Sequence, residues 1–176
     1  MTKEQERQEL HRAIWAIANE LRGSVDGWDF KSYVLGFLFY RFISEDLTNY
    51  INQGEWESGN KGYDYLDESD DTAVEGKDDI VQEKGYFILP SQLFQNVRGN
   101  AKNDENLNVT LAGVFDSIEG SANGTASEAD FKGLFDDIDV NSKKLGNTVA
   151  ERNAKLVKIL DRIGELKLGD LKDNGK

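Results

Sequence analysis

Apolar residues recur at intervals of three and four in several parts of the chain, which is the spacing of one face of an α-helix. The first such run spans residues 10–21 and follows the capping-box sequence Thr2-Lys3-Glu4-Gln5. It predicts a helix from about Lys3 to Arg22. The apolar members of the run are Leu10, Ile14, Ile17 and Leu21.

The next run, residues 30–43, is apolar almost all the way round, and such a helix must be surrounded by others. It is too short and too interrupted by Lys31 and Arg41 to span a bilayer. We therefore predict a core helix that begins after Asp26 or Asp29 and continues to Gly54. Its aromatic residues could be a platform for stacking bases, but rings this dense on one helix are more typical of a core: Phe37, Phe39, Tyr40 and Phe42.

Five further elements follow from residue 86 onward. Residues 86–89 precede Pro90 and are expected to be extended. Residues 91–97 and 107–120 predict helices, and Ser127 opens a short one. A second capping box at Thr148 predicts a long helix through Leu166. The expected fold is a mainly α, compact multi-helix domain over residues 1–170, with at most a short β segment.

Charge is concentrated in one segment. The net charge is −12, and residues 55–85 hold eleven acidic and three basic residues, so the remainder is close to balanced. Glycine, asparagine and acidic residues dominate this segment, which predicts a long, mobile acidic loop that Trp56, Tyr63 and Tyr65 pin locally. The net charge gives no support for a phosphate-binding surface. Because the remainder of the chain is close to balanced, a basic strip outside residues 55–85 is still compatible with this net charge.

Catalytic machinery is excluded by missing residues. The chain has no cysteine, a single histidine, His11, and no two glycines separated by one residue. Thiolate, sulfur-zinc and dinucleotide sites of these kinds are therefore absent. A P-loop is absent because no Gly-Lys precedes Ser or Thr, and a serine elbow is absent because no serine lies between glycines at its spacing. We expect no catalytic, cofactor-binding or metal-binding residue in this chain, and His11 is expected to be a packed or surface residue rather than a binding contact.

Two acidic patterns imitate functional sites. The sequence Asp137-Ile138-Asp139-Val140-Asn141 begins like a calcium loop, but its sixth and twelfth positions are Ser142 and Thr148, so a turn is favoured. The second pattern is a cluster of six acidic residues. A solvated charge run is favoured there over a metal or acid-base site, because acidic side chains in a flexible loop lack a fixed geometry. Its members are Asp67, Glu68, Asp70, Asp71, Asp78 and Asp79.

Several blocks together form a recognisable pattern. The segments 22–31 (RGSVDGWDFK), 33–36 (YVLG) and 39–44 (FYRFIS) carry most of it. The segments 10–15, 85–88, 90–94, 132–135, 145–149 and 166–170 add order and spacing. Together they resemble the N-terminal helical domain of the modification (methyltransferase) subunit of type I restriction-modification systems, over essentially the whole chain.

The resemblance implies a site-specific adenine DNA methyltransferase subunit that uses S-adenosylmethionine. It further implies a cytoplasmic assembly on duplex DNA with a specificity subunit, a second modification subunit and a restriction subunit. The family's catalytic motif, Asn or Asp before Pro-Pro and an aromatic residue, is missing because Pro90 is the only proline. This chain is therefore expected to be a non-catalytic domain that aids DNA clamping and assembly, with residues 171–176 starting a linker to the catalytic domain. Candidate DNA contacts are Arg22, Lys31, Arg41, Arg98 and Lys102.

Two other readings stay open. The chain could be a stand-alone acidic protein-interaction module or a DNA mimic, although mimicry needs acids spread over a rigid face. It could also be a small enzyme with an unfamiliar carboxylate site, which would require two acids in a rigid cleft.

Overall fold

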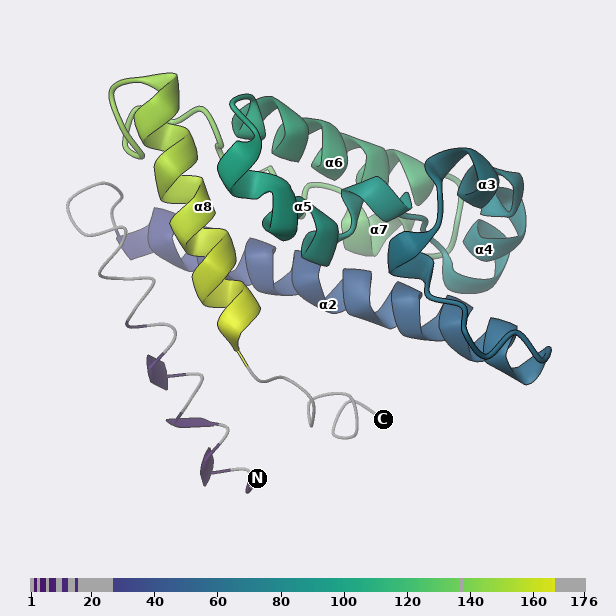
Figure 1. Ribbon diagram of the computed structural model, residues 1–176. Helices are drawn as coiled ribbons and strands as arrows, with labels where there is room; N and C mark the ends of the chain where they lie inside the picture. The colour runs from purple at the N-terminus through teal and green to yellow at the C-terminus, as the bar shows by residue number, and fades with distance from the viewer. Residues whose placement is uncertain are drawn as a thin grey trace.

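The computed structural model describes residues 27–136 and 138–166, with side chains from Ser32 onward, and eight residues near the N-terminus (Figure 1). These eight are Thr2, Glu4, Gln5, Arg7, Gln8, His11, Arg12 and Trp15. Thr2 and Gln5 exchange hydrogen bonds of 2.9 and 3.1 Å, as the capping box predicts. The rest of the predicted helix over 3–22 and the linker over 171–176 lie outside the described residues.

Helix α2 (Gly27–Glu57) is the longest described helix, and in Figure 1 most of the other helices lie on one side of it while α8 (Val149–Glu165) crosses it. It begins before Asp29, so Asp29 is not its cap, and Asp26 lies outside the described residues. Phe37 and Tyr40 are fully buried, which confirms the predicted core helix. Phe42 differs from its aromatic neighbours because 44% of its surface is exposed.

The prediction of a long mobile loop over residues 55–85 is wrong. This segment contains the 3₁₀-helix η1 (Tyr65–Asp67) and the helices α3 (Asp70–Glu75) and α4 (Lys77–Lys84). Caps stabilise these short polar helices where apolar periodicity does not. Ser69 Oγ accepts a hydrogen bond of 3.2 Å from Thr72 N, and Gly85 ends α4 with a φ of 87°.

Tertiary contacts also fix this segment to the core. The Asp70 carboxylate accepts hydrogen bonds of 3.0 Å from Ser91 N and 2.5 Å from Ser91 Oγ. Two of the three predicted aromatic anchors donate across the segment: Trp56 Nε1 to the Tyr63 carbonyl at 2.8 Å, and the Tyr65 hydroxyl to the Ile88 carbonyl at 2.7 Å. The local pinning by aromatic residues is thus confirmed.

The second half of the chain supplies the helices that pack on α2. They are η2 (Pro90–Gln92), α5 (Phe94–Asn100), η3 (Ala101–Asn103), α6 (Leu107–Ser121) and α7 (Glu128–Phe131). Stacked rings of Phe115 and Phe135, with centroids 4.3 Å apart, join α6 to the segment after α7. The Tyr40 hydroxyl donates to the Gln92 carbonyl at 2.5 Å, which ties α2 to η2.

Helix α8 (Val149–Glu165) closes the core and contacts α2, α5 and α6. Its start is confirmed, because Thr148 Oγ1 accepts a hydrogen bond of 3.1 Å from Glu151 N. Leu156, Ile159, Leu160 and Ile163 are fully buried. Residues 138–148, which precede α8, contain turns and no helix, and Asn141 N donates to Asp139 Oδ1, so the predicted turn at Asp139 is confirmed.

The described residues are mainly α-helical and include no β-strand, which confirms the expected fold class. No helix among them has the length and apolar character needed to cross a bilayer.

Candidate functional site

The structure describes the side chains of three of the five candidate DNA contacts, and they do not form one surface. Arg22 lies outside the described residues, and of Lys31 only the backbone, in α2, is described. Lys102 is exposed in η3. Arg41 and Arg98 instead point into the fold and meet on one element, the last turn of α8. A contact of any of these residues with DNA stays a prediction.

Arg41 links α2 to the end of α8. Its residue surface is 9% exposed, and its Nη1 donates a hydrogen bond of 2.6 Å to the carbonyl of Ile163. Its Nε lies 2.9 Å from Glu45 Oε1, one turn along α2. The Ile163 carbonyl also accepts a bond of 3.3 Å from Leu166 N, so Arg41 adds a second, charged donor at a helix end whose carbonyls lack i+4 partners, and its charge opposes the negative end of the helix dipole.

Arg98 approaches the same turn from α5. Its Nε lies 3.3 Å from Asp161 Oδ1, and its Nη2 donates to the Asp161 carbonyl at 3.4 Å. Gly164 makes this approach possible, because a Cβ at that position would lie 2.4 Å from the guanidinium of Arg98. Two arginines from different helices therefore hold the C-terminal turn of α8, and we call them the arginine clamp.

The clamp fixes the point at which the chain leaves the helical body. Leu166, directly after α8, is 6% exposed and turns out of the helix with a φ of −63° and a ψ of 134°. The arrangement orients the backbone and holds no reacting group. This role of Arg41 could not be predicted from the sequence, because Arg41 and Ile163 are 122 residues apart and no local pattern links them.

Buried hydroxyl groups are engaged by the backbone rather than poised for proton transfer. The Tyr86 hydroxyl donates to the Ile43 carbonyl at 3.0 Å, and burial, together with the nearby Asp46, raises its pKa. Burial likewise raises the pKa of Tyr65, whose hydroxyl bonds to Ile88. Phenols with raised pKa values stay neutral and serve as structural donors in this core.

Glu119 is a carboxyl group whose environment disfavours its charge. Burial first, and the nearby Asp136 and Asp116 next, raise its pKa, while a hydrogen bond from Phe135 N opposes the rise. An acid-base site needs a second group of matched pKa within reach of a substrate, and the charged groups that act on Glu119 are the carboxylates of Asp136 and Asp116. It is a packing feature of the α6 end.

Two of the surface hollows among the described residues are lined by several polar side chains. One of about 550 Å³ lies between η1, α3 and α5, and its lining includes Asp70, Ser91 and Asn96. Asp70 and Asn96 already bond to the fold there, through Ser91 and through the carbonyls of Leu66 and Pro90. The hollow is therefore lined by groups that hold η1, η2 and α3 together.

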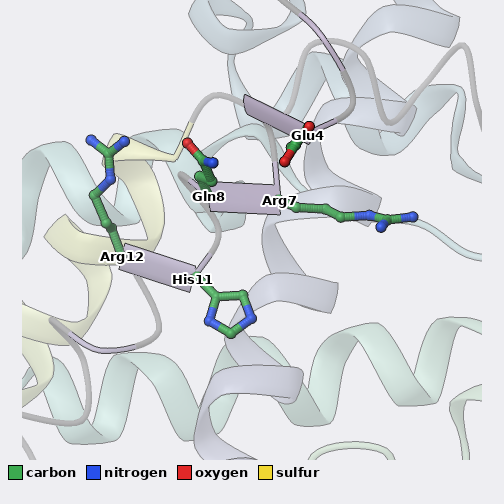
Figure 2. A pocket seen from close by; sticks show the side chains of 5 residues that line it. All are labelled: Glu4, Arg7, Gln8, His11 and Arg12. Carbon is green, nitrogen blue, oxygen red and sulfur yellow. The ribbon is translucent and has the colours of Figure 1, made fainter.

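The second hollow lies beside the N-terminal segment and is lined by Glu4, Arg7, Gln8, His11 and Arg12. Figure 2 shows the side chains of Arg7 and Arg12 pointing away from one another. The two cations thus do not converge on a single anion. His11 is exposed, in agreement with a surface position.

Within the described ranges, no group of three or more metal-ligating side chains comes together. In the calcium-like segment, Asp139 Oδ1 accepts from Asn141 N at 2.9 Å, a local turn contact. The side chain of Asn141 accepts a hydrogen bond from Asn108 Nδ2 at 2.5 Å, so it helps to hold α6.

Comparison with known proteins gives a consistent assignment. The chain is 46% identical over 179 residues to the type I restriction enzyme MpnII methylase subunit of Mycoplasma pneumoniae, over 97% of this chain and 32% of that protein. The crystal structure of a type I restriction-modification system methyltransferase subunit from Streptococcus thermophilus aligns with a TM-score of 0.71 and 26% identity, over 92% of this chain and 34% of that one. The chain thus spans about a third of the length of these relatives. The HsdM N-terminal domain family matches residues 10–163, and the chain belongs to that family.

Proposed function

We propose that this chain is a non-catalytic part of a site-specific adenine DNA methyltransferase subunit, in which it helps to clamp duplex DNA and to assemble the enzyme. One observation carries the proposal: 97% of the chain matches only 32% of a methylase subunit. In such a relative, most of the polypeptide lies outside this domain. Methyl transfer is then assigned to that remaining part.

The chemistry of the chain agrees with this division. Pro90 is the only proline, so the family's Pro-Pro catalytic motif is missing from the sequence. The residues present also do not fit S-adenosylmethionine. The described residues contain no strand, so the glycine-rich turn between a strand and a helix, which cradles such cofactors, has no counterpart among them. We therefore place the cofactor on the remaining part of the subunit.

A non-catalytic helical body is suited to holding DNA during the reaction. A base methyltransferase extrudes its target base from the duplex, at a cost of a few kcal/mol. A domain that stabilises the bound duplex or the subunit interface helps to offset this cost without touching the base. Lys102 is exposed and is available for a phosphate contact.

The proposed partners follow from the same assignment. The relative from Mycoplasma pneumoniae is named as the methylase subunit of a type I restriction enzyme. We therefore propose assembly with a specificity subunit, a second modification subunit and a restriction subunit, on duplex DNA in the cytoplasm.

The test is duplex affinity measured against ionic strength, for this chain alone and for the methylase subunit with and without it. We expect the subunit that contains the domain to bind duplex more tightly and to show a steeper salt dependence, because each added phosphate contact contributes about −0.9 to the slope of log K against log salt. Equal affinities and equal slopes with and without the domain would remove the clamping role.

One observation favours a second candidate function, an acidic protein-interaction surface. The acids of residues 70–83 sit on the ordered helices α3 and α4 rather than on a mobile loop. The exposed members are Asp71, Glu75, Asp78, Asp79 and Glu83. Salt-sensitive binding of this chain to a basic partner protein, with no effect of the domain on duplex affinity, would favour this alternative.

A further inference from the structure

Helix α2 exposes apolar side chains on the side that faces away from the core. Leu35 is 56% exposed and Phe42 is 44% exposed, and Leu38, which is partly buried and packs against the rim of the core, lies between them. Their spacing of three and four residues places all three on one side of the helix. We call these residues the α2 stripe. Phe37 and Tyr40, on the opposite side of α2, are fully buried.

The α2 stripe borders the point where the chain leaves the helical body. Arg41 is the neighbour of Phe42 in sequence, and its guanidinium reaches the carbonyl of Ile163 at 2.6 Å. Ile163 lies three residues before Leu166, the last described residue, which is itself buried. Leu166 therefore lies close to one edge of the stripe, and the arginine clamp holds the helical turn that precedes it.

The relatives indicate what covers this surface. The chain spans only 32% and 34% of the two methylase subunits that it matches, so those subunits carry a large additional body. A body joined to Leu166 by a short connection reaches a nearby surface at high effective concentration, which favours docking there. Burial of large exposed apolar side chains is favourable in proportion to the area removed from water.

We propose that the α2 stripe is the docking surface for the part of the methylase subunit that follows Leu166, and that Arg41 and Arg98 hold the end of α8 so that this part meets the stripe. The proposal rests on the proposed function, because it requires that the domain belong to a longer subunit. It adds which face of the domain is covered and which residues set the direction of the connection.

The test is hydroxyl-radical footprinting of this chain alone and of the same chain within the methylase subunit. Phe42 is expected to react readily in the isolated chain and several-fold more slowly in the subunit. Val109, on α6, is 65% exposed and is the control, which is expected to react at the same rate in both samples.

A matched pair of variants supplies the second measurement. The double variant Leu35→Ser/Phe42→Ser is compared with Val109→Ser/Val149→Ser, which also replaces two exposed apolar residues. In the subunit, the first variant is expected to increase proteolysis after Leu166 several-fold and the second to leave it unchanged. Both variants are expected to keep the unfolding midpoint of the isolated chain, because the replaced residues are exposed.

Several results would overturn the proposal. Unchanged labelling of Phe42 in the subunit would show that the rest of the subunit does not cover the stripe. Protection of Phe42 already in the isolated chain would assign the stripe to the N-terminal segment 3–22 if the chain is monomeric, or to a second copy if it is dimeric. Methylation assays on the same subunit separate the docking proposal from the proposed function. A subunit that methylates DNA while Phe42 stays unprotected refutes only the docking surface.

Discussion

Arg41 on α2 and Ile163 on α8 are joined by a hydrogen bond of 2.6 Å from a guanidinium to a main-chain carbonyl, across 122 residues of sequence. The guanidinium also pairs with Glu45 at 2.9 Å. This contact ties the central helix to the last turn of the final described helix. The sequence suggested Arg41 as a candidate DNA contact. In the structure, its guanidinium instead links two helices inside the fold.

Replacement of Arg41 by methionine is predicted to lower the free energy of unfolding by about 1–3 kcal/mol, because the carbonyl of Ile163 loses its charged donor and keeps only the bond of 3.3 Å from Leu166 N, and Glu45 loses its ion pair. Arg152→Met is the matched control. Arg152 also donates to carbonyls, those of Gly146 and Asn147, but at the start of α8 where water reaches them. Urea denaturation of the two variants measures the difference, and an equal loss for both would contradict the special role of Arg41.

Glycine is predicted to be required at position 36, because the side chain of Ile138 occupies the space that a Cβ would need. A Cβ at position 36 would lie 2.0 Å from Ile138 Cδ1, so Gly36→Ala overpacks the site and is expected to cost about 1–3 kcal/mol. In an Ile138→Ala background the clash is gone, and the same change should stabilise α2 by about 0.5–1 kcal/mol through helix propensity. A double-mutant cycle by thermal unfolding checks this. Additive effects would mean that the two residues are not in contact.

Thr148 is predicted to contribute as the N-cap of α8. Loss of its hydrogen bond to Glu151 N in Thr148→Ala should cost about 1 kcal/mol, whereas Thr148→Ser keeps the hydroxyl and should be close to neutral. Circular dichroism during urea denaturation measures both variants. The prediction fails if serine and alanine behave alike.

Glu119→Gln is predicted to stabilise the protein at neutral pH. Burial raises the pKa of Glu119, so the folded state holds the proton more tightly than the unfolded state does. The free energy of unfolding therefore falls as pH rises from the unfolded-state pKa through the folded-state pKa. Glutamine avoids this loss and still accepts the hydrogen bond from Phe135 N.

The measurement for Glu119 is a comparison of unfolding free energies at pH 7 and at about pH 4, near the ordinary carboxyl pKa. The advantage of Glu119→Gln over the natural protein should shrink at the lower pH. The exposed Glu75→Gln is the control for removal of one negative charge. An advantage that is independent of pH, or equal in the control, would rule out burial of the carboxylate as the cause.

Helices with clear apolar periodicity were predictable from the sequence. Residues 107–120 form α6 at nearly the expected bounds, and Thr148 caps α8 as its capping-box position predicts. In both cases the signal is local, because it lies within a few turns of the helix that it specifies. The burial of Phe37 and Tyr40 followed from the same local pattern.

Residues 55–85 were not predictable in this way. The helices α3 and α4 are short and polar, and they depend on caps and on contacts such as Asp70 with Ser91. Composition alone favours a loop for such a segment, since its stabilising partners lie elsewhere in the chain. The arginine clamp was not predictable either, because Arg41 and Arg98 meet the end of α8 only in the tertiary fold.

Methyl transfer from S-adenosylmethionine to duplex DNA tests the central claim most directly. Three samples are compared together with the specificity subunit: this chain alone, the methylase subunit, and the methylase subunit without residues 1–166. The account predicts that this chain alone transfers no methyl group and that removal of the domain lowers the methylation rate and duplex affinity of the subunit. Methylation by the isolated chain, or full activity without the domain, would contradict it.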